Sequence, residues 1–372
     1  MARESILNLR HRELGSTFNG IAWNNYLTPW DYSTNPNDEV IAVRTSAGVY
    51  DVTMLNVMRV SGDDATSVCD YLVSRDIAGS QKGQAMLCNI VDPESGYICD
   101  DIVIFNDGDN HYRVVTGSGD THKYLHQASS GKKISLKEDF DVHMISVQGP
   151  KALSLLSPHV TGDLSALKWF QHMDTSIFGC KVNIARVGYS GERGYEVYCE
   201  SKDAVYLWDT ILEIGKQYNV MACSWNSLDL VRVETGLMFY PYEMPGGKTI
   251  WECNMGWAIA KNKGSWMGKE KVMDQQGKER SKCAGIIAHW HEAIETGAKL
   301  YAEGKEVGIV TSPSYSRYLM KSLALVHLIP EYAKLGTNLE IRGPNITCKA
   351  VVESAPFYDP MKLRLRPEQI KK

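Results

Sequence analysis

The sequence lacks the short motifs that identify the common nucleotide-binding and hydrolytic enzymes. It holds no GxxxxGK[ST] phosphate loop, no GxGxxG after an expected strand, no GxSxG turn and no HExxH pair. Each of these motifs supplies one specific group, such as backbone amides for a phosphate, an exposed serine or two zinc-binding histidines. The corresponding nucleotide-binding, hydrolase and metalloprotease classes are therefore excluded as starting hypotheses.

Cysteines at metal-binding spacing are also absent. The nine cysteines are scattered, odd in number and include no CxxC pair. Disulfide scaffolds and structural zinc sites need clustered cysteines, so we expect reduced thiols. His289 and His291 can share one face of a strand, but no third ligand follows at a known spacing. We therefore expect no bound metal.

The chain has no excess of positive charge and no long apolar run. Its 372 residues include 40 Lys and Arg against 44 Asp and Glu, which gives a formal net charge of -4. Nucleic-acid binders usually present a basic face, and a membrane span needs about 20 apolar residues. Residues 1–12 are polar and lack the apolar core of a signal peptide. We therefore expect a cytoplasmic protein that binds neither nucleic acid nor membranes.

Short strands and helices alternate without a regular βαβ rhythm, which favours an α+β fold over a doubly wound sheet. A polar run at Met273–Lys282 reads as a linker. We predict a body over residues 1–275, in two subdomains of about 1–50 with 145–275, and 51–144. Several short strands separated by Gly and Pro turns follow the linker, which predicts a small β-barrel over residues 276–372.

Local patterns predict individual elements. Apolar strands around a Pro-Glu-Ser-Gly turn predict a hairpin over residues 86–105, and apolar spacing predicts helices over 204–218 and 227–238. Gly117-Ser118-Gly119 is best interpreted as a surface turn.

The first candidate for chemistry is Asp100-Asp101, at the start of an expected strand. Successive strand residues point to opposite faces, so one carboxylate can face a cavity while the other faces solvent. Taken alone, the pair is better explained as a solvated strand end.

The second candidate is the segment from Gly188 to Glu196, GYSGERGYE. Its glycines allow a ligand to approach the backbone closely. Glu196 lies between Tyr195 and Val197 in an apparent strand, where a buried carboxylate needs a donor. A pterin edge with paired N–H groups is one such donor, and a salt bridge within the protein is the alternative.

The third candidate is Arg232, in the helical segment Arg232–Gly236. Its planar guanidinium could bind a ligand carboxylate. An ordinary ion pair between helices is the alternative.

Seven segments, in this order, resemble the glycine-cleavage T-protein family, the folate-dependent aminomethyltransferases and their demethylase relatives. They are AVRTSAGVYDV (42–52), GYICDD (96–101), ISVQGP (145–150), GYSGERGYE (188–196), RVETG (232–236), NMGW (254–257) and MGKE (267–270). Each segment is weak alone, but their shared order is specific. The resemblance implies a T-protein-like arrangement of mixed sheets around a folate site, with a C-terminal barrel.

The resemblance also implies roles for particular residues. Asp100 matches the family carboxylate near the reactive nitrogens of tetrahydrofolate, which makes it the expected catalytic residue. Tyr189 and Glu196 match residues that contact the pterin, and Arg232 matches the arginine directed toward the folate tail. Tetrahydrofolate is therefore the expected cofactor.

Other positions depart from the T-protein pattern. Thr53-Met54 stands where a histidine-containing segment is usual, and aromatic residues gather in the N-terminal and 240–251 segments. Trp23, Trp30 and Tyr240 are therefore candidates for binding a methylated cation or a methoxylated ring. The alternative is that the tryptophans fill core space.

The leading hypothesis is a tetrahydrofolate-dependent demethylase that takes a methyl group from a sulfonium, a methylated amine or a methoxylated aromatic. The main alternative is an aminomethyltransferase acting with a lipoyl carrier protein. A second alternative is a folate-binding regulator without catalysis. The first two are one-carbon-group transferases, and the sequence does not identify the donor or the oligomeric state.

Overall fold

The computed structural model describes residues 2–371 and the side chains of residues 2–369. Residues 1 and 372, where the predicted domains begin and end, lie outside the described residues. The chain divides into two compact units. The first comprises Met1–Val57, Asp139–Thr235 and Tyr358–Lys372, and the second comprises Met58–Glu138 and Gly236–Phe357.

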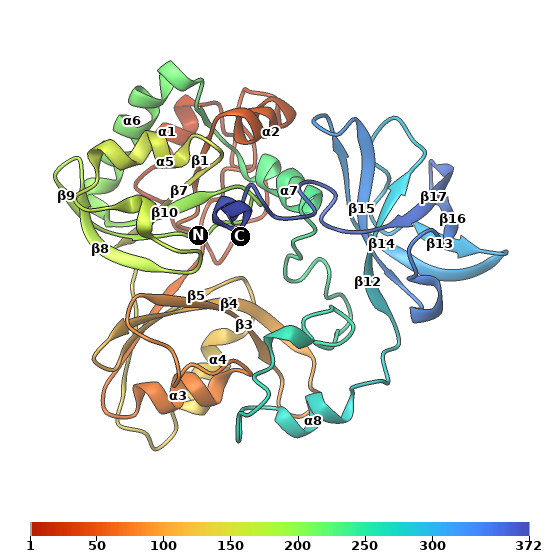
Figure 1. Cartoon of the computed structure of the whole chain (residues 1–372), viewed down its shortest axis with the longest axis horizontal. Coiled ribbons are helices and arrows are strands. Elements are labelled where there is room, and N and C mark those ends of the chain that lie inside the picture. The colour runs from red at the N-terminus through yellow and green to blue at the C-terminus, as the bar shows by residue number, and fades with distance from the viewer. Residues whose placement is uncertain (1, 372) are drawn as a thin grey trace. The chain divides into compact units, whose positions relative to one another are not determined.

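The first unit is built on a six-stranded sheet with the order β11-β1-β7-β10-β9-β8 (Figure 1). Only the short β1–β11 pair is parallel among the pairs described. The strands are β1 (Gly48–Asp51), β7 (Val142–Gln148), β8 (His172–Ile177), β9 (Cys180–Ala185), β10 (Gly194–Glu200) and β11 (Met221–Ala222). The helices are α1 (Asn8–Glu13), α2 (Pro36–Thr45), α5 (Ala152–Leu156), α6 (Ser201–Gly215) and α7 (Trp225–Glu234).

Helix α6 covers the sheet of this unit with one apolar face. Its buried residues Ala204, Leu207, Trp208 and Ile211 follow helical spacing and therefore form one apolar face. That face packs on β7 and β10, within a cluster of fully buried aliphatic side chains that includes Val147. The sheet and its helices thereby give β7 and β10 a rigid base.

The second unit contains a five-stranded sheet and a closed six-stranded barrel. The sheet, in the order β3-β4-β5-β2-β6, comprises β2 (Val57–Ser61), β3 (Gln84–Val91), β4 (Ile98–Gly108), β5 (His111–Thr116) and β6 (Ser135–Glu138). Its helices are α3 (Ala65–Leu72), α4 (Thr121–Ala128) and α8 (Lys269–Asp274). Apolar residues of α3 and α4, such as Leu72 and Leu125, pack with Ile102 and Ile104 of β4 in one core.

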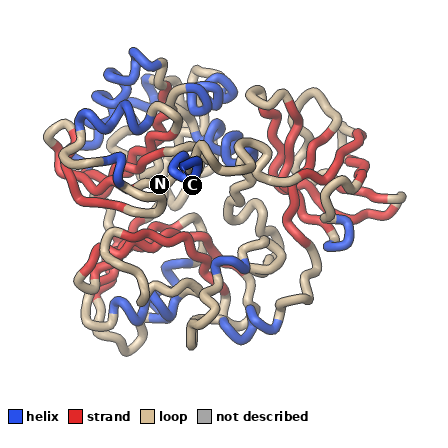
Figure 2. The backbone as a smooth tube through the Cα atoms, in the orientation of Figure 1, coloured by secondary structure: helices blue, strands red, loops and turns tan. Residues whose placement is uncertain are grey.

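The barrel closes in the order β12-β15-β14-β13-β16-β17, and Figure 2 shows its strands in red, joined by loops. Its strands are β12 (Lys282–Ala288), β13 (Lys299–Ala302), β14 (Lys305–Ser316), β15 (Lys321–Leu328), β16 (Asn338–Arg342) and β17 (Thr347–Glu353). Its interior is filled by aliphatic side chains such as Leu300, Val326 and Ile341. The predicted α+β fold with a C-terminal β-barrel is confirmed.

Short 3-10 helices complete the chain, at Ser157–His159, Leu164–Ala166, Lys216–Tyr218, Gly256–Ala258, Pro330–Tyr332 and Pro367–Lys371. Over residues 2–371, no helix combines the length and apolarity that crossing a bilayer requires.

Helix α7 ends earlier than the sequence predicts, at Glu234 rather than Met238. Gly236 follows with φ of 65°, a left-handed conformation that commonly terminates a helix. A Cβ at Gly236 would also lie 2.7 Å from the Cβ of Ala355. The predicted hairpin over 86–105 and the helix beginning near residue 204 are both present.

Candidate functional site

Asp100 is a fully buried carboxylate at the start of β4, in the second unit. Its Oδ2 accepts a 2.5 Å hydrogen bond from the Oγ1 of Thr121, the first residue of α4. Its Oδ1 accepts hydrogen bonds from the backbone amides of Asp101 at 3.0 Å and Ser118 at 3.1 Å. The carboxyl group is therefore held in one orientation by groups from three segments.

Two opposing effects set the protonation of Asp100. Burial raises its pKa, while hydrogen bonds from Thr121 and from the backbone of residues 118, 119 and 101 lower it. Burial prevails, and the pKa of Asp100 is raised to about 6. Both protonation states are accordingly accessible near neutral pH, as proton transfer requires.

The segment Gly117-Ser118-Gly119, which the sequence suggests is a surface turn, forms a half-buried bend that closes around Asp100. A Cβ on Gly117 would lie 2.6 Å from Oδ1 of Asp100, and one on Gly119 would lie 1.8 Å from the carbonyl oxygen of Cys99. The two glycines are therefore needed for close approach to the carboxyl group. The sequence shows the glycines but not that the antiparallel pairing of β5 with β4 places them beside Asp100.

Tyr240 lies in the same unit as Asp100 and is electrostatically coupled to it. The hydroxyl of Ser118, whose amide bonds Asp100, donates to the carbonyl oxygen of Tyr240 at 3.3 Å. Burial, followed by the nearby Cys99 thiol and the Asp100 carboxylate, raises the pKa of Tyr240 to about 12. The structure thus brings together two residues that the sequence suggested separately.

Glu196 lies on β10 in the first unit, partly buried. Its Oε2 accepts a 2.8 Å hydrogen bond from the hydroxyl of Tyr198. Burial raises the pKa of Glu196 to about 7, although the bond from Tyr198 opposes that shift. No ion pair to Glu196 is recorded within the described residues, so the salt-bridge alternative has no support there.

Tyr189 and Arg232 are also in the first unit, in different environments. Tyr189 is partly exposed in the loop between β9 and β10. Arg232 is fully buried on α7, and its guanidinium pairs with Asp229 at 2.7 Å. Asp229 is about one-third exposed, so this ion pair reaches the surface.

The tryptophans Trp23 and Trp30 pack with Trp225, the first residue of α7. Their ring centroids are 5.6 to 6.3 Å apart, in tilted and edge-to-face orientations that aromatic pairs favour. Trp23 and Trp225 are buried, whereas Trp30 is partly exposed. Trp30 therefore offers the accessible part of this cluster.

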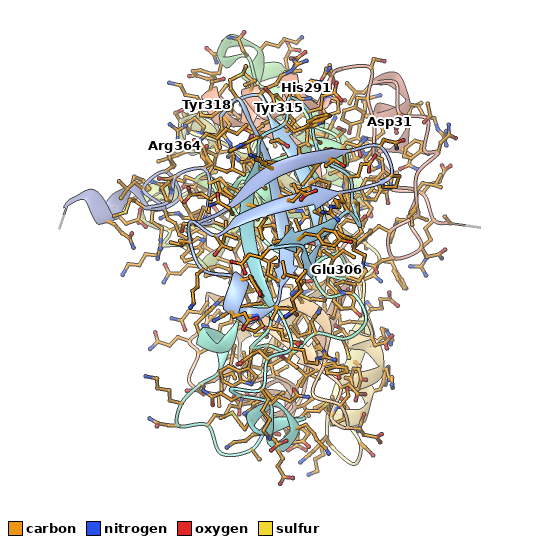
Figure 3. The ribbon with its side chains drawn as sticks, turned by 90° about the vertical axis from the view of Figure 1, so that its right-hand side faces the viewer. Asp31, His291, Glu306, Tyr315, Tyr318 and Arg364 are labelled. Atoms are coloured by element: carbon orange, nitrogen blue, oxygen red, sulfur yellow. The ribbon has the colours of Figure 1, made fainter. Side chains whose placement is uncertain are left out.

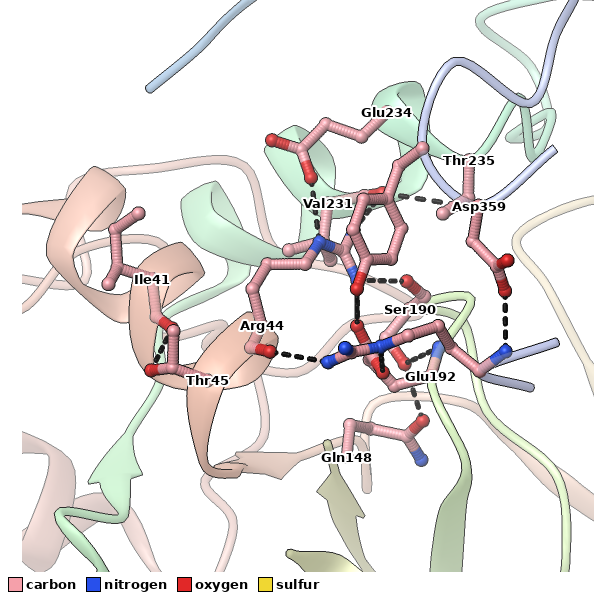
Figure 4. Close-up of polar contacts among 12 residues, drawn as sticks. Ile41, Arg44, Thr45, Gln148, Ser190, Glu192, Val231, Glu234, Thr235 and Asp359 are labelled. Carbon is pink, nitrogen blue, oxygen red and sulfur yellow. Dashed lines mark hydrogen bonds and ion pairs between the residues drawn. The ribbon is translucent and has the colours of Figure 1, made fainter. Parts of the chain in front are cut away.

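The first unit contains a buried cluster of charged side chains that the sequence does not predict. Arg44 of α2 pairs with Glu234 at 2.8 Å and Glu192 at 3.2 Å, and donates to the carbonyl oxygen of Ser190 at 2.8 Å (Figure 4). All three charged side chains are at most 1% exposed. The sequence feature that could have indicated this cluster is that its charged residues, Arg44, Glu192 and Glu234, each lie in a segment resembling the T-protein family.

The histidine pair considered as a partial metal site lies just beyond β12 of the barrel. His291 is three-quarters exposed and lies at the barrel surface (Figure 3). Over residues 2–371, no three His, Cys, Asp or Glu side chains gather in a way that could hold a metal ion. All nine cysteines are free thiols.

Comparison with known proteins identifies the family. A family profile described as the GCVT N-terminal domain matches residues 7–263, and one described as the glycine cleavage T-protein C-terminal barrel domain matches residues 282–359. The chain belongs to the glycine-cleavage T-protein family. The resemblance found in the sequence and the expected class, a one-carbon-group transferase, are thereby confirmed.

Two kinds of T-protein relative are similar to this chain. The heme-dependent oxidative N-demethylase gamma subunit of Ectopseudomonas mendocina is 36% identical over 369 residues, covering 97% of each chain. The aminomethyltransferase of Bacillus subtilis is 32% identical over 324 residues, covering 85% of this chain and 89% of the relative.

One solved structure matches nearly the whole fold. The aminomethyltransferase T of the glycine cleavage system from Bartonella henselae superposes with a TM-score of 0.88 at 21% identity, covering 97% of this chain and 99% of that one. At this identity the likeness shows the T-protein fold alone.

Proposed function

We propose that this T-protein is a tetrahydrofolate-dependent one-carbon transferase of the demethylase branch, which places the carbon of an N-methyl group on tetrahydrofolate. The observation that carries the proposal is Asp100, a buried carboxyl group with a pKa near 6 and a fixed orientation. A carboxyl group that is buried, fixed in orientation and able to change protonation near neutral pH is suited to proton transfer.

The proposed chemistry requires a proton acceptor. When a methylated ammonium donor is attacked, the new bond forms between the methyl carbon and N5 of tetrahydrofolate, and the carbon–nitrogen bond of the donor breaks. The departing amine keeps the bonding electron pair and leaves neutral, so it needs no strong acid. The proton on N5 must then leave, and the ionised Asp100 accepts it. Alignment of carbon and nitrogen supplies the rest of the acceleration.

The other predicted residues supply binding in this proposal. Glu196, when ionised, accepts paired N–H donors from the pterin edge, and Tyr189 contacts the ring. Arg232 binds toward the anionic tail, near the surface that its ion pair with Asp229 reaches. Trp23, Trp30 and Tyr240 are proposed to contact the methylated donor, which the partly exposed Trp30 can attract by a cation–π interaction.

The relative named as an N-demethylase subunit favours a methylated amine over a sulfonium or an aryl ether. Its name also describes a subunit of an oxidative enzyme, so we propose a protein partner for this chain. If that partner oxidises the N-methyl group, the carbon arrives as formaldehyde. Formaldehyde and tetrahydrofolate then condense to 5,10-methylene-tetrahydrofolate and water, and Asp100 again serves in proton transfer.

A second candidate function is aminomethyl transfer from a lipoyl carrier protein, because the 32% identical relatives are named aminomethyltransferases. That reaction would yield 5,10-methylene-tetrahydrofolate and ammonia. Thr53-Met54 stands where T-proteins usually have a histidine-containing segment, and this departure weighs against the second function.

Identification of the folate product separates these reactions. The full chain is incubated with tetrahydrofolate and, separately, with a panel of methylated amines, with formaldehyde, and with an aminomethylated lipoyl carrier protein. Product from a methylated amine or accelerated product from formaldehyde, lost in Asp100→Ala, supports the proposal. Product only with the carrier protein establishes the second function. Tetrahydrofolate binding with no turnover on any donor identifies a non-catalytic folate-binding regulator.

A further inference from the structure

Glu192 lies in the middle of the loop that joins β9 to β10, between Tyr189 and Glu196. Its buried carboxylate contacts Arg44 at 3.2 Å, the hydroxyl of Tyr358 at 2.6 Å and the Nε of Arg364 at 3.1 Å. Figure 4 shows Glu192 beside Arg44 and Ser190. Two of the three partners come from the C-terminal segment, residues 358–369, which follows the barrel in the sequence and returns to the first unit.

The loop is also fitted closely to its other neighbours. A Cβ on Gly188 or on Gly194 would lie 2.1 Å from the amide oxygen of Gln148 on β7. The hydroxyl of Ser190 donates to that same oxygen at 2.7 Å. These contacts fix the two ends of the loop, and the C-terminal segment holds its middle through Glu192.

The C-terminal segment has its own attachments to the first unit. The amide of Tyr358 donates to the carbonyl oxygen of Glu234 at 2.8 Å, and Arg364 donates to the carbonyl oxygen of Arg44 at 2.7 Å. Farther along, Glu368 pairs with the buried Arg186 at 3.0 Å. The segment is therefore bound to the first unit at several points along its length. Its contacts with Glu192 are made by Tyr358 and Arg364.

Charge and burial explain why Glu192 needs these partners. Glu192 and Glu234 carry two negative charges, which Arg44 and Arg364 balance with two positive ones. A buried carboxylate with fewer donors would be drawn toward solvent, and the loop would move with it. Burial and the bond to Glu192 raise the pKa of Tyr358 above its ordinary value, so its hydroxyl remains a donor.

We propose that the C-terminal segment is a positioning device for the folate site, in which Tyr358 and Arg364 act through Glu192 to preorganise the loop carrying Tyr189. This inference rests on the proposed function, because it assigns Tyr189 and Glu196 to the pterin. A loop ordered before binding loses less conformational entropy when the folate arrives. Tyr358, Arg364 and Glu192 are positioning residues and contact no reacting atom in this proposal.

Tyr358→Phe tests the proposal by removing one hydroxyl and keeping the ring. We expect the KM for tetrahydrofolate to rise about tenfold, because the lost hydrogen bond has a charged acceptor. The kcat at saturating tetrahydrofolate should be unchanged, since Asp100 is untouched. Hydrogen exchange of the loop amides of residues 188–194, measured without folate, should be faster than in the wild type.

Tyr32→Phe is the matched control. Tyr32 is also buried in the first unit, 8% exposed against 6% for Tyr358, and its hydroxyl lies 2.9 Å from the Nδ1 of the buried His11. The two variants should lose similar thermal stability, but Tyr32→Phe should leave the KM and the exchange of residues 188–194 unchanged. Equal effects of both variants on KM would show a merely structural role and overturn the proposal.

Arg364→Met provides a second, independent variant, at a side chain that is 38% exposed. It should raise the KM for tetrahydrofolate, as Tyr358→Phe does. Arg364→Lys should raise the KM less than Arg364→Met does. Unchanged exchange of residues 188–194 in both Tyr358→Phe and Arg364→Met overturns the positioning role. Absence of tetrahydrofolate binding by the wild type would instead contradict the proposed function, while the exchange result still decides whether the segment orders the loop.

Discussion

The Oγ1 of Thr121 lies 2.5 Å from the Oδ2 of Asp100. The backbone amides that reach the other oxygen are farther away, at 3.0 and 3.1 Å. Because Thr121 begins α4 and Asp100 lies near the start of β4, this hydrogen bond ties a helix terminus to the proposed catalytic carboxylate. The side chain of Thr121 should accordingly tune the protonation of Asp100.

Thr121→Val is expected to weaken turnover at pH 7 by about tenfold, the effect of losing one hydrogen bond to a charged group. The bond from Thr121 lowers the pKa of Asp100, so its loss raises that pKa further. The acidic limb of the plot of kcat against pH should shift to higher pH. Thr66→Val is the control, since Thr66 bonds Tyr112 at 2.8 Å in the same unit. An unshifted pH profile in Thr121→Val would contradict the assigned role of Asp100.

Asp100→Asn should abolish turnover and yet stabilise the fold at pH 8. The folded pKa of about 6 is above the ordinary value of 3.8, so the folded state holds this proton more tightly than the unfolded state. The stability from that preference is present below about pH 4 and is lost as the pH rises through 6. The variant cannot ionise, so it should gain up to about 3 kcal/mol over the wild type above pH 7.

Thermal unfolding from pH 4 to pH 8 measures this gain. The difference in Tm between Asp100→Asn and the wild type should grow with pH, with most of the growth between pH 4 and pH 7. A difference that does not change with pH would show that burial does not set the protonation of Asp100.

Glu196→Gln should remove the pH dependence of tetrahydrofolate binding. Free Glu196 has a pKa of about 7, and pterin N–H donors bind its ionised form. The wild-type affinity should therefore increase as the pH rises from 6 to 8, while the variant should bind about tenfold more weakly at pH 8 with little change over this range. Titration calorimetry at several pH values measures both effects.

Tyr198→Phe gives an independent check on Glu196. The hydroxyl of Tyr198 donates to Glu196 at 2.8 Å and lowers its pKa. Without that donor, the midpoint of the pH-dependent binding should move to higher pH, and the affinity at pH 9 should change little. A midpoint that stays in place would assign the pH dependence to another group.

The sequence predicts the barrel and the β3–β4 hairpin well because their strands are apolar and separated by turn residues. It does not predict β6 or β8, whose sequences SLKE and HMDTSI are polar. Both lie at the edge of a sheet, where solvent covers one side and the hydrophobic signal is weak. Their recognition as strands depends on a neighbouring strand, which a local pattern cannot supply.

In the candidate site, too, the sequence predicts local features but not the contacts between distant residues. The motifs around Asp100 and Glu196 are short and local, so the sequence shows them directly. The contacts that define their chemistry are distant in sequence: Thr121 is 21 residues from Asp100, and Glu234 is 190 residues from Arg44. Raised pKa values at Asp100 and Glu196 follow from burial, which only the folded chain determines.

Arg44→Met is expected to destabilise the fold by about 3 to 5 kcal/mol at pH 8, because removing one partner of a buried ion pair leaves uncompensated charge. Arg44 is the partner that Glu192 and Glu234 share. Without it, the two buried carboxylates lose their shared positive partner, which favours proton uptake by the folded state. The deficit in unfolding free energy should therefore shrink between pH 8 and pH 5.

Chemical denaturation at pH 5 and pH 8 measures that deficit, and Arg186→Met is the matched control. Arg186 is also buried in the first unit, but its partner Glu368 is about half exposed and keeps its hydration when the arginine is lost. Its deficit should hence be nearly the same at both pH values. If Arg44→Met also shows a deficit that does not depend on pH, the loss comes from packing, and the two glutamates do not depend on Arg44 for their charge.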